Sequence, residues 1–252
     1  MILNETNKWS LNVSILDSNK NSPCKNLCNG FYVGDLLDYE TVLSFGRKCD
    51  LITYEIEHIN TQALFDLEKE GIIVYPKPET LKIIQDKNSQ KEFYRRNELP
   101  TADFSFYSNV NDLKNGIKEG EIEFPCVWKK TKFGYDGFGV KILKSVEDLN
   151  DIPESEMIIE KLIPFEKEIA VIVARNSKGK IKNFDVVEME FNEISNQVEF
   201  VISPSNISEE IKNDAIRTAI EIAEKFNLIG LLAVEMFLTE DNQIFINEVA
   251  PR

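Results

Sequence analysis

The sequence predicts a protein of mixed α/β and α+β class, in which an N-terminal domain of parallel βαβ units precedes two β-rich regions. Three observations support this prediction. In residues 1–100, short β-branched runs alternate with helical runs, as they do in parallel βαβ units. In residues 101–164 and 165–252, most structured runs resemble strands. The last of these runs flank Asp241-Asn242, a dipeptide that favours the tight turn of a β-hairpin.

In the first region, helices and strands are expected to alternate. We expect, in order, a helix over 2–10, strands over 11–17 and 31–33, a helix over 38–47, a strand over 51–59, a helix over 61–70 and a strand over 72–76. A single amphipathic helix is predicted over 78–99, because its apolar residues recur at helical spacing and Pro100 follows it. A first strand that such a domain would have is missing, since the chain begins where a helix is already under way.

The second and third regions are expected to be mainly strands. We expect strands over 124–130, 139–143, 156–162, 166–175, 182–192 and 196–205, with a short helix over 145–149. Residues 208–230 predict a long helix in which Ser208 is the N-cap and Ile211, Ala215, Ala219 and Ile222 lie on the apolar side.

Composition excludes several classes of function. Of 252 residues, 42% are hydrophobic and 29% are charged, and the net charge of −14 argues against a nucleic-acid-binding surface. The chain has no apolar run of about 18 residues and no basic-then-apolar N-terminus, so we expect neither a membrane span nor a signal peptide. A cytoplasmic protein is therefore expected.

Histidine and cysteine are too scarce for several kinds of site. His58 is the only histidine, and the four cysteines show no paired CxxC spacing. Both a zinc site and a Ser-His-Asp or Cys-His site are thereby disfavoured. Any chemistry must use carboxylates, lysines, arginines and bound metal.

The C-terminal hairpin brings two carboxylates together. If residues 241–242 form a two-residue loop, Met236 lies opposite Asn247 and Glu235 lies opposite Glu248. Opposed side chains on antiparallel strands have Cβ atoms about 4.5–5.5 Å apart, and like charges there repel. A shared proton or, more commonly, a bridging divalent cation would offset this repulsion, and Asn247, expected on the other face, offers a third oxygen. The alternative is an edge hairpin whose glutamates are solvated or whose register is shifted by one residue.

Four further segments point to an anionic ligand. The turn FGYDGFG (133–139) follows Lys129, and its glycines would let backbone amides approach a phosphate. Lys87 could also reach a phosphate. Glu160 and Glu168 flank a strand end that could bind a nucleobase and a ribose, and Glu55 and Glu57 lie where a parallel strand ends. Taken alone, the glycine-rich turn is better explained as a hairpin with solvated lysines, Lys87 as a solvated side chain, and the segment from Glu160 to Glu168 as an ordinary interdomain crossover.

Taken together, these segments resemble the ATP-grasp superfamily, and within it the PurK-type 5-(carboxyamino)imidazole ribonucleotide synthases. The resemblance spans essentially the whole chain. It is carried by the segments YEIEH (54–58, close to the fungal form), IIQDK (83–87), Gln90-Lys91, PTADF (100–104), GYDGFG (134–139), IPFEKEIAVIVAR (163–175), LLAVEMF (231–237) and INEVAPR (246–252). It implies an ATP-grasp fold with a pre-ATP-grasp βαβ domain (1–100), a lid (101–164) and a C-terminal antiparallel-sheet subdomain (165–252).

The resemblance also implies an enzyme that uses ATP and Mg²⁺ to join bicarbonate to the amine of 5-aminoimidazole ribonucleotide, and an enzyme that forms homodimers. ATP would first phosphorylate bicarbonate, and the amine would capture the carboxyphosphate or the CO₂ that it releases. The implied ATP-binding residues are Lys87, Lys129, Gly134, Tyr135, Asp136, Gly137, Gly139, Glu160, Lys161, Leu162, Ile163, Glu168, Asn247 and Glu248. The implied metal ligands are Glu235 and Glu248, and the ribonucleotide and bicarbonate side would be lined by Glu57, Tyr135, Asp136 and Arg252, of which the last three are the catalytic candidates.

The sequence departs from the family pattern in three places. The family begins with a strand and GGGQLG, which this chain lacks, and continues after INEVAPR with PHNSGH and a further small domain. Phe138 stands where the family has a basic residue. A chain truncated at both ends is therefore expected, and two alternatives follow: another ATP-grasp ligase with a different acceptor, or an inactive ATP-binding fragment.

Overall fold

A computed structural model describes residues 2–132, 134, 139–192 and 197–252 of the chain. These residues form two compact units, 1–81 and 82–252, and each is described by itself. Among the described residues, no helix is long and apolar enough to cross a membrane.

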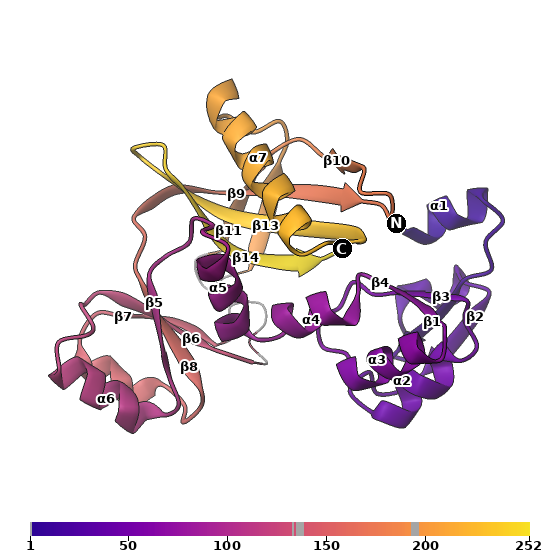
Figure 1. The fold of residues 1–252 in the computed structure, drawn as a ribbon, viewed down its shortest axis with the longest axis horizontal. Coiled ribbons are helices and arrows are strands. Elements are labelled where there is room, and N and C mark those ends of the chain that lie inside the picture. The colour runs from indigo at the N-terminus through magenta and orange to yellow at the C-terminus, as the bar shows by residue number, and fades with distance from the viewer. Residues whose placement is uncertain (1, 133, 135–138, 193–196) are drawn as a thin grey trace. The chain divides into compact units, whose positions relative to one another are not determined.

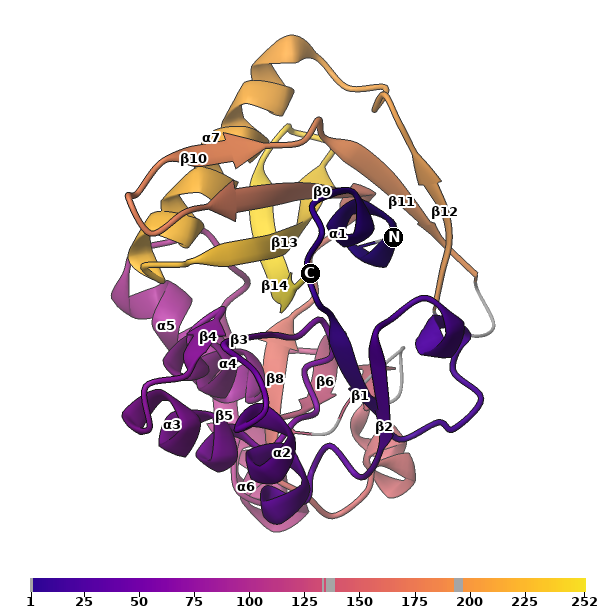
Figure 2. The same cartoon turned by 90° about the vertical axis from the view of Figure 1, so that its right-hand side faces the viewer.

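The first unit contains the expected parallel strand pairs. Its elements are α1 (Ile2–Lys8), β1 (Ser14–Asp17), η1 (Pro23–Asn26), β2 (Gly30–Val33), α2 (Tyr39–Gly46), β3 (Leu51–Thr53), α3 (Thr61–Lys69) and β4 (Ile73–Tyr75). Strand β1 pairs with β2 and β3 pairs with β4, both in parallel, and Figure 2 shows the first pair side by side. The side chains of Asp38 and Asn60 cap α2 and α3. The strand predicted over 51–59 ends at Thr53, so Glu55 and Glu57 lie beyond it.

The helix predicted over 78–99 is in fact two helices. These are α4 (Pro78–Ile84) and α5 (Lys87–Arg96). The helix is interrupted at Asp86, which has extended backbone angles. The Asp86 side chain accepts a hydrogen bond from the Ser89 amide at 3.0 Å and so caps a new helix. Helical spacing of apolar residues continues across the break, and this continuity misled the prediction. The break places Lys87 at the first position of α5.

Residues 101–164 form a four-stranded antiparallel sheet. Its strands β5 (Phe104–Tyr107), β6 (Cys126–Lys130), β7 (Val140–Leu143) and β8 (Met157–Lys161) lie in the order β5-β8-β6-β7. The helix predicted over 145–149 is the 3-10 helix η2 (Val146–Asp151). Strand β5 and helix α6 (Val110–Lys118), neither of which was predicted, complete this sheet and its apolar core.

The C-terminal region is an antiparallel sheet with one long helix on one face. The strands are β9 (Phe165–Arg175), β10 (Ile181–Asn183), β11 (Val187–Phe191), β12 (Val198–Ile202), β13 (Gly230–Thr239) and β14 (Ile244–Pro251), in the order β12-β11-β9-β13-β14, with β10 on β9. Helix α7 (Glu209–Lys225) crosses the sheet in Figure 1, and Ser208 caps it as predicted. Its apolar side packs on alternate residues of β9 and β13.

The opposite face of this sheet carries the acidic residues. Glu235 pairs with Glu248 on β14 and with Ala170 on β9, and Glu168 pairs with the next same-face residue of β13, Phe237. Because successive residues of a strand point to opposite faces, all three glutamates lie away from α7.

The predicted pairing of Glu235 with Glu248 is confirmed, although the predicted loop is wrong. The loop spans residues 240–242, Asn242 has a φ of 63°, and Thr239 N donates to Gln243 O at 3.0 Å. Met236 therefore pairs with Ile246 instead of Asn247, and the register shifts back between Glu235 and Met236. Asn247 is the extra residue of a β-bulge, so the bulge cancels the shift that the longer loop introduces. Ile246, which directly precedes Asn247, is buried in the core on the face of the sheet that α7 covers.

Candidate functional site

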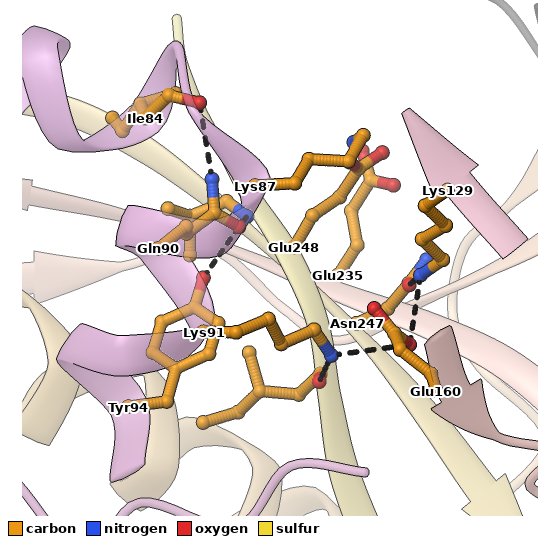
Figure 3. A network of polar contacts seen from close by, with 12 residues as sticks. Ile84, Lys87, Gln90, Lys91, Tyr94, Lys129, Glu160, Glu235, Asn247 and Glu248 are labelled. Carbon is orange, nitrogen blue, oxygen red and sulfur yellow. Dashed lines mark hydrogen bonds and ion pairs between the residues drawn. The ribbon is translucent and has the colours of Figure 1, made fainter. Parts of the chain in front are cut away.

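Lys87 and the two facing glutamates form the first part of the site. The Lys87 ammonium makes an ion pair with Glu248, and Figure 3 shows the lysine pointing from α5 toward both carboxylates. Lys87 lowers the pKa of Glu248 to about 2, so this carboxylate is ionised at neutral pH. Burial and the charge of Glu248 raise the pKa of Glu235 to about 7. Near neutral pH, Glu248 is therefore charged and Glu235 is partly protonated.

Two further charged groups border this pair. Burial raises the pKa of Glu168 to about 7, and Glu248 adds to the shift. The Arg252 guanidinium lies 3.6 Å from a Glu235 carboxylate oxygen. A concentration of carboxylates that water does not fully solvate binds cations well, because a cation removes both the repulsion and the desolvation cost.

Lys129 forms the second part of the site. Its Nζ donates to Asn247 Oδ1 at 2.8 Å and lies 3.1 Å from Glu160 Oε2. Asn247 was expected to point to the other face, but the bulge turns its side chain toward Lys129 (Figure 3). Lys87 and Lys129 thus reach neighbouring residues of β14 from α5 and β6.

Glu160 is a buried anchor for two lysines. It is 2% exposed, and Lys91 Nζ lies 3.3 Å from the same Oε2 that Lys129 approaches. Burial would raise the pKa of Glu160, but Lys129 and Lys91 together hold it below its ordinary value. Figure 3 shows the two lysines converging on this carboxylate.

Gln90 connects α5 to β14, next to the facing glutamates. Its Oε1 accepts hydrogen bonds from the Tyr94 hydroxyl at 2.7 Å and from the Val249 amide at 3.1 Å. Gln90 and Tyr94 are 3% and 0% exposed, so this contact is shielded from water. It fixes β14 immediately after Glu248.

The structure brings most, but not all, of the predicted residues together. Lys161 is the last residue of β8, and Leu162 and Ile163 lie between β8 and β9. Lys161 N donates to Asp103 O at 2.8 Å. Gly139 has a φ of 90°, and a Cβ added to it would lie 3.3 Å from the Gly134 Cα, so this position favours glycine. Tyr135, Asp136, Gly137 and Phe138 lie outside the described residues. Glu57 lies in the first unit, after β3, and its predicted role stays a prediction.

Three residues of the network were not assigned a role from the sequence. These are Gln90, Lys91 and Thr101, which lie in two of the segments that carry the resemblance. Their roles depend on contacts with Glu160, Ile246 and Val249, which are distant in sequence. A lysine in an amphipathic helix is expected in solvent, and only the buried partner reveals otherwise.

The donor set suits Mg²⁺. Among the described residues, no group of three or more histidine, cysteine, aspartate or glutamate side chains is arranged to hold a metal ion. Mg²⁺ is commonly bound by one or two carboxylates together with substrate phosphates and water, and not by a cage of protein ligands. Glu235 and Glu248 supply two such carboxylates, and Lys87 and Lys129 suit phosphate oxygens.

Comparison with known families identifies the fold. A model of the ribonucleotide synthetase preATP-grasp domain matches residues 1–85, and a model of the ATP-grasp domain matches residues 92–252. The chain belongs to the ATP-grasp family. The fold predicted from the sequence is thereby confirmed, including its antiparallel C-terminal sheet.

Individual ATP-grasp proteins are similar over the whole chain. A phosphoribosylaminoimidazole carboxylase of Vigna aconitifolia is 33% identical over 100% of this chain and 45% of its own. The crystal structure of an N5-carboxyaminoimidazole ribonucleotide synthetase from Thermotoga maritima has a TM-score of 0.87 and 36% identity, covering 99% of this chain and 64% of that one. An Aspergillus clavatus N5-carboxyaminoimidazole synthase, in complex with ADP and 5-aminoimidazole ribonucleotide, has a TM-score of 0.87 and 28% identity over 99% and 66% of the two chains. The chain thus spans less than half of the curated relative.

Proposed function

We propose that this chain carries out the ATP-dependent carboxylation of 5-aminoimidazole ribonucleotide with bicarbonate in purine biosynthesis, giving the carboxyamino product, ADP and phosphate. The observation that carries the proposal is the facing pair Glu235 and Glu248 with Lys87 and Lys129 beside it. The similarity to proteins named as N5-carboxyaminoimidazole ribonucleotide synthetases supports this particular acceptor.

The two lysines would bind the ATP phosphates. In phosphoryl transfer the protein mainly positions the reactants and neutralises charge on the transferred group. Lys87 and Lys129 can exchange their contacts with Glu248 and Asn247 for phosphate oxygens. Mg²⁺ held by Glu235 and Glu248 would supply further charge neutralisation at the phosphates.

Glu160 and the residues after it would bind the nucleoside. Glu160 Oε1 is buried and has no hydrogen-bond partner within the described part of the chain. A buried acceptor without a donor is costly, so a ligand that brings an N–H group, such as the amine of adenine, would be favoured. The backbone of residues 161–163 follows directly, and Glu168 is proposed to bind the ribose hydroxyls.

The ribonucleotide and bicarbonate side is proposed to include Glu57, Tyr135, Asp136 and Arg252. Arg252 is the one that the structure relates to the rest of the site, through Glu235. Its guanidinium suits a carboxylate or phosphate. A homodimeric assembly and a cytoplasmic location stay predictions.

The first experiment is phosphate release from ATP by the purified chain. With Mg²⁺ and bicarbonate present, we expect 5-aminoimidazole ribonucleotide to stimulate the release, and we expect the carboxyamino product to be detected by mass spectrometry. Glu248→Gln should abolish the stimulated release. Glu240→Gln, an equivalent change at an exposed position of the same hairpin, should not affect it.

Two results would overturn the proposal. Nucleotide binding without stimulated release would show a nucleotide-binding chain that does not catalyse the reaction. Release stimulated by a different amine, and not by 5-aminoimidazole ribonucleotide, would show an ATP-grasp ligase of another specificity.

A further inference from the structure

Lys91 is a buried charged residue that the proposed mechanism does not use. It is 3% exposed and lies one turn after Lys87 on α5. Its Nζ donates to Thr101 Oγ1 at 2.7 Å and to the Ile246 carbonyl at 3.4 Å, and it lies 3.3 Å from Glu160. An ammonium group has three donors, so these three acceptors can take all of them. Lys91 is therefore bound by the protein and not presented to a ligand.

Lys91 changes the charge balance around Glu160. A single buried lysine would neutralise this carboxylate, and the pair would carry no net charge. With both Lys91 and Lys129 on the same carboxylate oxygen, the buried cluster has one positive charge in excess. Lys129 can therefore contact Glu160 and at the same time keep its hydrogen bond to Asn247 at 2.8 Å.

The same ammonium group holds the bulged segment of β14. Thr101 Oγ1 also donates to the Ile246 carbonyl at 2.8 Å, and the Ile246 amide donates to Pro100 O at 2.7 Å. Ile246 directly precedes Asn247 and Glu248. One lysine therefore contacts both the carboxylate that anchors Lys129 and the strand that presents the metal ligand.

We propose that Lys91 is a positioning residue of the nucleotide site and acts on Lys129 through Glu160. Its contact with the Ile246 carbonyl fixes the β14 bulge in the same arrangement. The inference rests on the proposed nucleotide site and extends it to a residue that does not touch the ligand.

The first test is the affinity of Lys91→Met for ADP in the presence of Mg²⁺, measured by titration calorimetry. We expect the dissociation constant to rise about tenfold or more, because the residues that support directly binding groups commonly have effects of this size. Lys225→Met, the same change at an exposed position of α7, should leave it unchanged. Leu113→Ala destabilises the core beneath the β5-β8-β6-β7 sheet and should lower the melting temperature without this loss of affinity.

A double-mutant cycle separates positioning from a general structural role. If Lys91 acts chiefly through Lys129, the factor by which Lys91→Met raises the ADP dissociation constant should be several-fold smaller once Lys129→Met is present, and the contact of Lys91 with the Ile246 carbonyl accounts for what remains. An equal factor in both backgrounds would overturn the proposal, as would an unchanged affinity of the single variant.

A crystal structure of Lys91→Met gives a result that does not depend on nucleotide binding. We expect Lys129 to move onto Glu160 and to lose its hydrogen bond to Asn247, and an intact bond would overturn the proposal. If this variant does not fold, Lys91→Met/Glu160→Gln removes both buried charges together, which proteins tolerate better. Wild-type ADP affinity in that variant would also overturn it. Failure of the carboxylation assay alone bears on the proposed function and not on Lys91.

Discussion

Replacing Lys87 with methionine is expected to weaken ADP binding and, at the same time, to strengthen the binding of free Mg²⁺. Lys87 makes an ion pair with Glu248 and holds the pKa of that carboxylate near 2. In the free protein the ammonium thus occupies the carboxylate that a metal ion would use, and it repels a divalent cation placed there. Without it, Glu235 and Glu248 face each other, and Arg252 and Lys129 compensate their repulsion only in part. We expect free Mg²⁺ to bind about tenfold more tightly and ADP about tenfold more weakly, each measured by calorimetry.

The control for this prediction is Lys82→Met, which makes the same change at an exposed position of α4. It should alter neither affinity. A Lys87→Met variant that binds free Mg²⁺ more weakly than the wild type would show that Lys87 supports the metal site instead of competing for it. Equal ADP affinities would show that Lys87 does not contact the phosphates.

The pairing of Glu235 with Glu248 could be predicted from the sequence, although the turn on which the prediction rested is not the turn that forms. A two-residue loop at 241–242 places Glu235 opposite Glu248, and so does the observed loop of 240–242 followed by a bulge at Asn247. The longer loop and the bulge cancel, because they move the register by one residue in opposite directions. The hydrophobic alternation of β13 and β14 requires the same pairing, since only this register buries Val234 against Val249.

The supporting network could not be predicted, because it depends on partners far apart in the sequence. Lys91 and Glu160 are ordinary surface residue types. Glu160 is buried because Lys91 and Lys129 neutralise it, and Lys91 is buried because Glu160 lies beside it. Helix α6 was not predicted because its local sequence does not favour a helix. Its sequence VNDLKNGIK includes two asparagines and a glycine, which have low helix propensity, and it forms because Leu113 packs into the core beneath the sheet.

The second large effect is expected for Glu235→Gln, which should make the metal-free protein more stable at pH 8. Burial and Glu248 raise the pKa of Glu235 from 4.5 to about 7 in the folded protein. The folded state therefore binds this proton more tightly than the unfolded state does. The bound proton therefore stabilises the folded state fully below pH 4.5, and this stabilisation is lost as the pH rises to 7 and above. Glutamine removes this loss, which amounts to about 3 kcal/mol for a pKa raised from 4.5 to about 7.

Urea unfolding at pH 5 and pH 8, followed by the fluorescence of the buried Trp128, would measure the effect. The wild type should lose stability between the two pH values, and Glu235→Gln should lose less. Glu168 shifts in the same direction and will leave part of the dependence in the variant. Glu240→Gln removes the same charge at an exposed position of the hairpin, so it corrects for the general repulsion of a chain with a net charge of −14. Added Mg²⁺ should stabilise the wild type at pH 8 and Glu235→Gln much less. A cation can relieve the repulsion between Glu235 and Glu248 only where both carboxylates are present. Equal stabilisation of both proteins by Mg²⁺ would mean that the metal ion does not bridge this pair.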